Sequence, residues 1–194
     1  MGAIDLASAV VPANTQEKFM DVLARRHIFE KRMNYKHGTG HGIGSYLKVH
    51  EGPTYVGMSD SREHSSKLRP NMFFSDEPGY YKTGEFGIRL ESILQVIGTS
   101  ANLLDDNYGI ISLNVSFLEV DLDLKNPIRI AGEFITFQPV TLVPFEPKLI
   151  QHQLLNKEHK NWINLYNVKI KQKVLSQIDD ERTISWLTKR THPL

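Results

Sequence analysis

Three residues of this chain have the side chains of a metal site, and each stands in a distinctive local sequence. They are His41 in His-Gly-Thr-Gly-His-Gly-Ile-Gly (37–44), Glu77 in Asp-Glu-Pro-Gly-Tyr (76–80) and Glu91 in Gly-Ile-Arg-Leu-Glu (87–91). One imidazole and two carboxylates suit a divalent cation such as Mn²⁺ or Zn²⁺. A hydrolytic site with two metal ions normally needs more anionic oxygen than two carboxylates provide. The three residues therefore look like half of a metal site.

His37 and His41 stand four residues apart, which invites two simpler explanations that fit poorly. A zinc-binding helix with this spacing needs a Glu directly after the first His, where the chain has Gly38. The glycines of this segment also oppose a helix. A phosphate-binding loop needs a Lys followed by Ser or Thr, and none follows here. An isolated pair of this kind is more often structural than metal-binding.

A β-hairpin over residues 71–97 is expected to bring the two carboxylates together. The prediction places its first strand at 72–75, its turn at 82–85 and a long, apolar second strand at 86–97. Facing strands would direct Glu77 and Glu91 into one cleft.

The segment before the hairpin predicts one helix and one short strand. Residues 16–33 favour an amphipathic helix with a break near its middle. Its apolar residues at helical spacing are Phe19, Val22, Leu23, Ile28 and Phe29. Residues 37–53 are rich in glycine and end in proline, which opposes a helix, and residues 47–49 favour a short strand.

The segment after the hairpin predicts a loop, a strand and two helices. Residues 99–132 are irregular in pattern and predict a long loop, and a strand is predicted at 134–143. A helix is predicted at 156–177, and Asp179 or Asp180 can cap a last short helix.

The composition is that of an ordinary globular domain without disulfides. The chain has 194 residues, of which 40% are hydrophobic, so a real core can form. Lys plus Arg number 23 and Asp plus Glu number 22, which argues against nucleic-acid binding through a general basic field. The chain has no Cys, which suits a reducing compartment. No segment approaches the roughly 20 apolar residues that span a bilayer. We therefore expect a cytoplasmic protein with no membrane or nucleic-acid partner.

Taken in order, the three segments closely resemble the cytosolic type of Xaa-Pro aminopeptidase, within the metallopeptidase family that has the pita-bread fold. The resemblance continues through His-Glu-Gly-Pro (50–53), Phe-Gln-Pro-Val-Thr-Leu-Val-Pro (137–144) and the tail at 186–193. It implies an α/β fold, namely the second half of a pita-bread (creatinase/aminopeptidase) domain with a curved antiparallel sheet, plus a C-terminal extension of strand and helix. The half-domain would occupy residues 1–132, with an atypically long loop at 99–132, and the extension residues 133–194.

The resemblance also implies roles for the polar residues. His41 and Glu77 would ligate one metal ion and Glu91 would bridge two ions, for which Mn²⁺ is expected and Zn²⁺ or Co²⁺ are alternatives. Glu77 would also be the general base that takes a proton from the attacking water. His50 would steady the oxyanion of the tetrahedral intermediate, and His37 would hold the substrate near its proline.

Three further residues beside these are assigned more modest roles. Arg89 would orient the carboxylates from outside the ligand set, with a surface ion pair as its alternative. Tyr80 and Tyr81 are interpreted as hairpin packing.

The substrates implied are proline-containing peptides that lose their N-terminal residue when proline is second. Family members often dimerise through the C-terminal region, so a homodimer is expected.

The family has two further ligands, which are aspartates upstream of its His-Gly-Thr-Gly-His-Gly segment. The only Asp residues before His37 are Asp5 and Asp21, and neither stands in a matching segment. Two close divalent cations repel strongly, and Glu77 and Glu91 offer only two negative charges against four positive ones. We therefore predict one weakly bound ion, no stable two-metal site and little hydrolysis by the chain alone. It would be an incomplete fragment of the enzyme. The alternatives are an inactive binding or dimerisation module and a prolidase-like dipeptidase.

Overall fold

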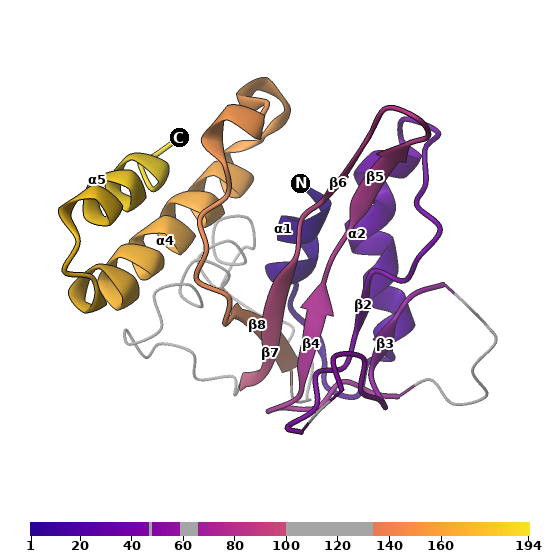
Figure 1. Cartoon of the computed structure of the whole chain (residues 1–194). Coiled ribbons are helices and arrows are strands. Elements are labelled where there is room, and N and C mark those ends of the chain that lie inside the picture. Colours follow the sequence, from indigo (N-terminus) through magenta and orange to yellow (C-terminus); the bar gives the residue numbers. More distant parts are fainter. Residues whose placement is uncertain (47, 59–65, 100–133) are drawn as a thin grey trace, which may run out of the picture. The chain divides into compact units, whose positions relative to one another are not determined.

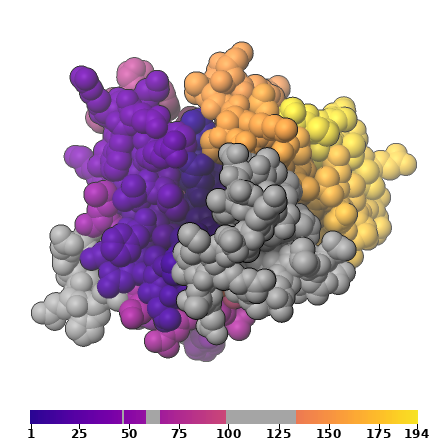
Figure 2. Space-filling view, turned by 180° about the vertical axis from the view of Figure 1, so that it is seen from behind, coloured from indigo at the N-terminus to yellow at the C-terminus, as the bar shows by residue number. Residues whose placement is uncertain are grey.

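The structure is a computed structural model that describes residues 1–46, 48–58, 66–99 and 134–194. These residues form two compact units, Met1–Val140 and Thr141–Leu194. Figure 2 shows the surface of the described residues in colour and the others in grey. Apart from Thr99, which ends a strand, the predicted loop at 99–132 lies outside the described residues. The boundary predicted between residues 132 and 133 lies there too and stays a prediction.

An antiparallel sheet of four strands forms the core of the first unit (Figure 1). Its order is β1 (Val11–Pro12), β8 (Phe134–Pro139), β7 (Ser92–Thr99) and β4 (Phe73–Asp76). Alternate residues of the three longer strands point to one face. The buried side chains on that face are Phe74, Leu94, Val96, Ile135 and Phe137. The strand predicted at 134–143 thus forms as β8, but it ends at Pro139.

The predicted hairpin forms in two parts. β4 pairs with β7, and β5 (Gly79–Lys82) pairs with β6 (Phe86–Arg89) around a turn in which Gly84 has a φ of 76°. The expected uninterrupted second strand is wrong, because the pairing breaks between β6 and β7. Pro78 has no N–H to offer the ladder, which accounts for a break at this position.

The break places the two glutamates opposite each other. Asp76 is paired with Ser92 before the break, and Gly79 is paired with Arg89 after it. The register is the same on both sides, so Glu77 and Glu91 face each other across the break. The expectation that the hairpin brings these two residues together is confirmed.

The helix predicted at 16–33 forms as a 3₁₀ turn, η1 (Glu17–Phe19), followed by α2 (Met20–Phe29). Its predicted apolar face is wrong. Phe19 and Val22 are 58% and 49% exposed, whereas Asp21 and Arg25 are 0% and 4% exposed. The two charged residues can be buried because Arg25 Nε lies 2.7 Å from Asp21 Oδ2, which compensates both charges.

The glycine-rich segment forms β2 (Gly40–His41), which pairs with β3 (Tyr55–Val56). The short strand predicted at 47–49 is wrong, since Lys48 and Val49 are not in a strand and Leu47 is not described. A Cβ at Gly40 would lie 1.8 Å from the carbonyl oxygen of Ser75. Glycine is therefore needed for the His41 segment to lie against β4, the strand that leads to Glu77.

The second unit contains α4 (Lys157–Val174) and α5 (Glu181–Arg190), with 3₁₀ turns at η2 (Pro147–Leu149), η3 (His152–Leu154) and η4 (Leu175–Gln177). Its core contains Tyr166, Ile170 and Leu187. The predicted cap is confirmed, because the Asp180 carboxylate accepts a hydrogen bond from the Thr183 N–H at 2.7 Å. Among the described residues of the first unit, the remaining helix is α1 (Gly2–Ala7). No helix among the described residues is both long and apolar enough to cross a membrane.

Candidate metal centre

The structure brings the three predicted ligands together. A ring nitrogen of His41 and carboxylate oxygens of Glu77 and Glu91 all lie within 4.8 Å of one another. His41 comes from β2, and the two glutamates come from the break in the hairpin. Two carboxylates directly opposite each other on paired strands repel. A cation among these three side chains would remove that repulsion.

His41 directs a ring nitrogen toward Glu77. Its Nδ1–H donates to the carbonyl oxygen of Gly42 at 3.0 Å, so the lone pair of the neutral ring is on Nε2. Nε2 lies 3.2 Å from Oε1 of Glu77. Two acceptors this close are satisfied only by a proton or a cation between them. A histidine whose second nitrogen is held by a carbonyl oxygen is also the usual form of a metal ligand. The donor set therefore fits a divalent ion.

Glu77 is held in one orientation by its neighbours. Its side chain is 8% exposed. Oε1 accepts a hydrogen bond from Ser75 Oγ at 2.9 Å, and Oε2 accepts one from an Arg89 terminal nitrogen at 3.0 Å. Its backbone N–H donates to the Thr39 carbonyl oxygen at 2.7 Å. These contacts hold both carboxylate oxygens in place, so Glu77 presents one defined orientation to a metal ion.

Ser75 connects the two candidate ligands His41 and Glu77. Its Oγ accepts the backbone N–H of His41 at 3.0 Å while it donates to Glu77. The side chain of Ser75 is fully buried. It therefore fixes the His41 backbone relative to the Glu77 carboxylate, and sequence analysis did not identify it. Its position two residues before Glu77, on the same face of β4, is the signal that could have found it.

The other predicted site residues lie around this cluster. The His50 ring meets the His41 ring edge-on, with centroids 4.0 Å apart, and His50 is exposed. Glu91 is exposed as well. Arg89 pairs with Glu77 as described, although 43% of its side chain is exposed. The catalytic, ligand and substrate-binding roles assigned to these residues remain predictions.

His37 is connected to Arg89 through Tyr81. The Nδ1–H of His37 donates to the Gly38 carbonyl oxygen at 2.7 Å, so Nε2 accepts from the Tyr81 hydroxyl at 2.7 Å. The same hydroxyl oxygen accepts from Arg89 Nε at 2.9 Å. Arg89 thus joins Tyr81 and His37 to the candidate ligand Glu77. Tyr81 was interpreted as hairpin packing, and its hydroxyl contacts were missed.

Two glycines make room for the Tyr81 ring. A Cβ at Gly79 would lie 2.5 Å from the Tyr81 hydroxyl oxygen, and a Cβ at Gly87 would lie 2.8 Å from its Cδ1. Gly87 is the cross-strand partner of Tyr81. A tyrosine opposite one glycine and two residues from another is a pattern that the sequence contains. It could have indicated that this ring is held in one place.

Asp76 is buried beside the site but is a poor ligand candidate. It is 2% exposed, and its Oδ1 has no hydrogen-bond partner among the described residues. Burial raises the pKa of its carboxyl well above the usual range. A neutral carboxyl is a weak metal ligand. Strand alternation also directs Asp76 away from the face that Ser75 and Glu77 use.

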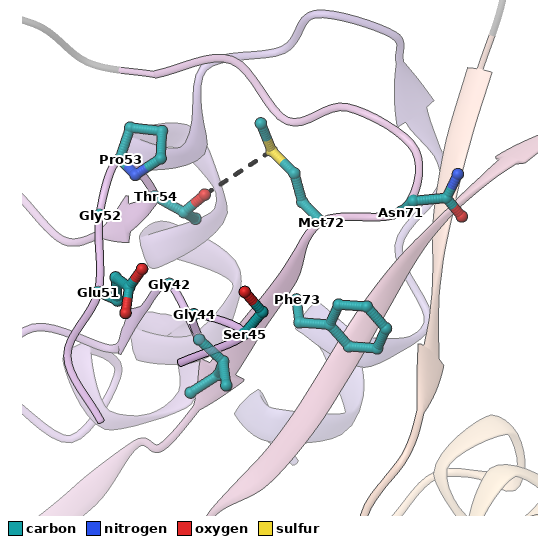
Figure 3. Close-up of a pocket in the computed structure, with 11 residues that line it drawn as sticks. Gly42, Gly44, Ser45, Glu51, Gly52, Pro53, Thr54, Asn71, Met72 and Phe73 are labelled. Carbon is teal, nitrogen blue, oxygen red and sulfur yellow. Dashed lines mark hydrogen bonds between the residues drawn. The ribbon is translucent and has the colours of Figure 1, made fainter. Parts of the chain in front are cut away.

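A pocket of about 490 Å³, shown in Figure 3, is separate from the three candidate ligands. It is lined by residues 42–45, 51–54 and 71–73, and the Thr54 hydroxyl faces the Met72 sulfur at 3.8 Å. None of the three candidate ligands lines it, and Glu51 is the one charged residue among the described residues that do. The donor set, and not the size of this pocket, locates the candidate functional site.

Sequence profiles of one metallopeptidase family match most of the chain. Metallopeptidase family M24 matches residues 3–97, and the C-terminal region of peptidase_M24 matches residues 133–194. The first match contains every candidate site residue. The second begins one residue before β8.

Curated relatives are similar to the chain along its whole length. It is 35% identical over 195 residues to a probable Xaa-Pro aminopeptidase P of Talaromyces stipitatus and 34% identical over 195 residues to aminopeptidase P1 of Lotus japonicus. These alignments cover 100% of this chain but 26% and 25% of the relatives. The chain thus spans about a quarter of the length of the curated relatives it matches.

A solved structure is similar to the whole chain. It is the X-prolyl aminopeptidase from Caenorhabditis elegans, described as a cytosolic enzyme with a di-nuclear active site. The TM-score is 0.79 at 28% identity, and the match covers 100% of this chain and 27% of that one. The likeness confirms the expected fold class, a mixed α/β part of a pita-bread domain with antiparallel sheets.

Proposed function

The chain belongs to metallopeptidase family M24, and from that premise we propose that it is the C-terminal catalytic part of a metal-dependent Xaa-Pro aminopeptidase. Such an enzyme removes the N-terminal residue from peptides with proline in second position. The names of the relatives support this substrate class. The observation that carries the metal chemistry is His41 Nε2 lying 3.2 Å from the Glu77 carboxylate, with Glu91 in reach.

In this proposal His41 and Glu77 would hold one divalent ion, and Glu91 would be a ligand shared with a second. Imidazole and carboxylate ligands suit Mn²⁺, with Zn²⁺ and Co²⁺ as alternatives. When bound, the ions supply Lewis acidity at the scissile carbonyl and an activated water as nucleophile. The di-nuclear site of the Caenorhabditis elegans relative supports a pair of ions.

The chain's own residues would move protons and hold the substrate. Arg89 and Ser75 hold both oxygens of the Glu77 carboxylate in place, so it can accept a proton from the attacking water. His50 is exposed beside His41, where its imidazole can donate to the developing oxyanion. His37, oriented by Tyr81, would contact the substrate near its proline.

The electrostatics support a site that this chain builds only in part. Two divalent ions carry four positive charges, and Glu77 and Glu91 neutralise two. The proposed two-metal site therefore needs further carboxylates, and the resemblance points to two aspartates. The chain alone should bind one ion weakly.

The metal part of this proposal is tested by calorimetric titration of Mn²⁺ into the chain and two variants. Glu77→Gln keeps the shape of the side chain but removes its charge, and Glu85→Gln does the same in the exposed hairpin turn. We expect the chain and Glu85→Gln to bind alike and Glu77→Gln to lose at least about tenfold in affinity. Equal binding by Glu77→Gln would show that the His41–Glu77 pair holds no ion.

The reaction is tested in a chimaera in which this chain replaces the matching part of the Caenorhabditis elegans enzyme. Hydrolysis of a tripeptide with proline second is the expected result. Hydrolysis of Xaa-Pro dipeptides alone would indicate a prolidase-like enzyme. No hydrolysis together with no Mn²⁺ uptake would favour a non-catalytic binding or dimerisation module.

Location and assembly belong to the same proposal. We place the protein in the cytoplasm, because the solved relative is described as cytosolic, and we expect a homodimer formed through residues 133–194. Light scattering on the chain and on a truncation at residue 140 tests the dimer, which should be lost on truncation.

A further inference from the structure

A buried charged pair on α2 holds the segment that carries His37. Arg25 makes four hydrogen bonds, with Asp21 Oδ2 at 2.7 Å, Asn34 Oδ1 at 2.6 Å and the carbonyl oxygens of Tyr35 and His37 at 2.7 Å each. One guanidinium group thus binds three points of residues 34–37. The planar fork of arginine can do this, whereas the single ammonium group of lysine cannot match its geometry.

The same pair fixes the surroundings of the His37 ring. The Arg25 guanidinium carbon lies 3.7 Å from the centre of the Tyr35 ring, and the Tyr35 and His37 rings pack with centroids 4.8 Å apart. The His37 carbonyl and one face of its ring are therefore both set by Arg25. The ring has two polar contacts, with Nδ1–H donating to the Gly38 carbonyl oxygen and Nε2 accepting from the Tyr81 hydroxyl, and both depend on where Arg25 holds the His37 backbone.

Asp21 links the charged pair to the candidate ligand Glu77 through Thr39. The Thr39 hydroxyl donates to Asp21 Oδ1, and it accepts from the Tyr35 hydroxyl. Burial raises the pKa of Tyr35 to about 12, so this hydroxyl stays protonated as a donor at neutral pH. The Thr39 carbonyl oxygen accepts the backbone N–H of Glu77. The pair on α2 is thus linked to both His37 and Glu77.

Stability alone does not explain why this pair is buried. Two charges pay a desolvation penalty that their attraction often only balances, so a buried ion pair stabilises a fold little compared with apolar residues of the same volume. Two buried charges that bind several backbone groups of one segment are better explained by the geometry they impose.

We propose that Asp21 and Arg25 are positioning residues that hold the His37 imidazole in the Nδ1–H form, with Nε2 directed to Tyr81 and the substrate side. This inference rests on the proposed function, in which His37 contacts the substrate. Its physical content, the orientation and tautomer of His37, does not depend on metal or activity.

The test is ¹⁵N NMR of His37 in the metal-free chain, with unfolding midpoints in urea measured in parallel. Arg25→Lys keeps the charge beside Asp21 but lacks the fork. We expect its midpoint to stay near that of the unmodified chain while His37 loses the single Nδ1–H signature and shows the mixed tautomers of a free imidazole. Arg26→Gln is the matched control, because its side chain is 64% exposed on the same helix, and both measurements should stay unchanged.

Retention of the Nδ1–H signature in Arg25→Lys would overturn the proposal. An equal loss in Arg26→Gln would do the same. Asn34 is exposed, so Asn34→Ala should fold even if Arg25→Lys does not, and it should shift the His37 tautomer in the same direction by less. An unchanged tautomer in Asn34→Ala would also contradict the proposal.

In the chimaera, Arg25→Lys should raise the KM for the tripeptide more than it lowers kcat. Failure of the chimaera to hydrolyse peptides would reject the proposed function and leave the NMR result standing.

Discussion

The two parts of the hairpin that carries Glu77 and Glu91 differ in how they are held. In the β4–β7 part, Phe74 and Leu94 are fully buried, and β8 pairs with the other edge of β7. In the β5–β6 part, Phe86 and Ile88 are 51% and 46% exposed, and no further strand pairs with it among the described residues. The first part is fixed by packing, and the second by the polar contacts of a few side chains.

The candidate site lies at the junction of these two parts. Glu77 follows the packed strand β4 directly, whereas Arg89 belongs to the exposed part and donates to Glu77. Tyr81, also in the exposed part, contacts Arg89 and His37. The packed part thus places the candidate ligand Glu77, and Arg89 of the exposed part orients it. An exposed apolar strip next to a functional site is also typical of a surface that another polypeptide covers.

Removal of packing from the buried part should have the largest effect. Phe74→Ala creates a cavity against Phe137, whose ring centroid is 5.3 Å away, and should lower the free energy of unfolding by about 3–5 kcal/mol. Phe86→Ala, in the exposed part, should change it by no more than about 0.5 kcal/mol. Urea unfolding measures both, and equal losses would contradict the division of the hairpin.

Loss of the charge that orients Glu77 should come next. Arg89→Gln removes the ion pair with Glu77 and the hydrogen bond to Tyr81. We expect Mn²⁺ affinity to fall about 10–100-fold, the usual cost of losing a partner of a metal ligand. The matched control is Lys82→Gln, which breaks an exposed ion pair with Glu85 in the same part. An affinity unchanged in Arg89→Gln would limit Arg89 to a surface role.

A methyl group beneath the Tyr81 ring should have a moderate effect. In Gly87→Ala the new Cβ would lie 2.8 Å from Tyr81 Cδ1, so the ring must move. Because Tyr81 is partly exposed and can shift, we expect a loss of about 1 kcal/mol in unfolding free energy, at the low end for overpacking. Gly52→Ala is the control, since nothing lies within 4 Å of its Cβ. A crystal structure of Gly87→Ala with Tyr81 in place would count against this reading of the glycine pattern.

Removal of the Tyr81 hydroxyl should have the smallest effect on stability. Tyr81→Phe loses the hydrogen bonds with His37 and Arg89 at a partly exposed position, which should cost about 0.5–1 kcal/mol. The sharper readout is the His37 Nε2 resonance, which should report loss of its donor. Tyr80→Phe, on the neighbouring residue, should leave that resonance unchanged.

Local signals were enough to predict the three candidate ligands and the hairpin that brings Glu77 and Glu91 together. The Gly84 turn and the flanking β-branched and aromatic residues predicted a hairpin, and strand pairing then required Glu77 and Glu91 to face each other. The Asp180 cap was predicted for the same reason, because a cap depends on residues three apart in sequence.

Contacts between distant segments account for what was missed. Helical spacing alone suggested that Val22 and Phe29 form the buried face of α2. Asp21 and Arg25 are buried instead, because their hydrogen-bond partners come from residues 34–39. Likewise, Tyr81 and Ser75 acquire their roles from His37 and His41, more than thirty residues away. No periodicity rule encodes such pairings.

The sequence by itself determined which chemistry is available: one imidazole and two carboxylates in segments that resemble a metallopeptidase. It also determined the hairpin, since strand pairing is set by a local turn. Only the tertiary structure decided that His41 turns Nε2 toward Glu77, that Arg89 and Tyr81 connect this pair to His37, and that a buried charged pair on α2 holds His37 in place. Those features depend on distances between residues far apart in the chain, and burial makes each unpaired charge or hydrogen bond costly enough to select one arrangement.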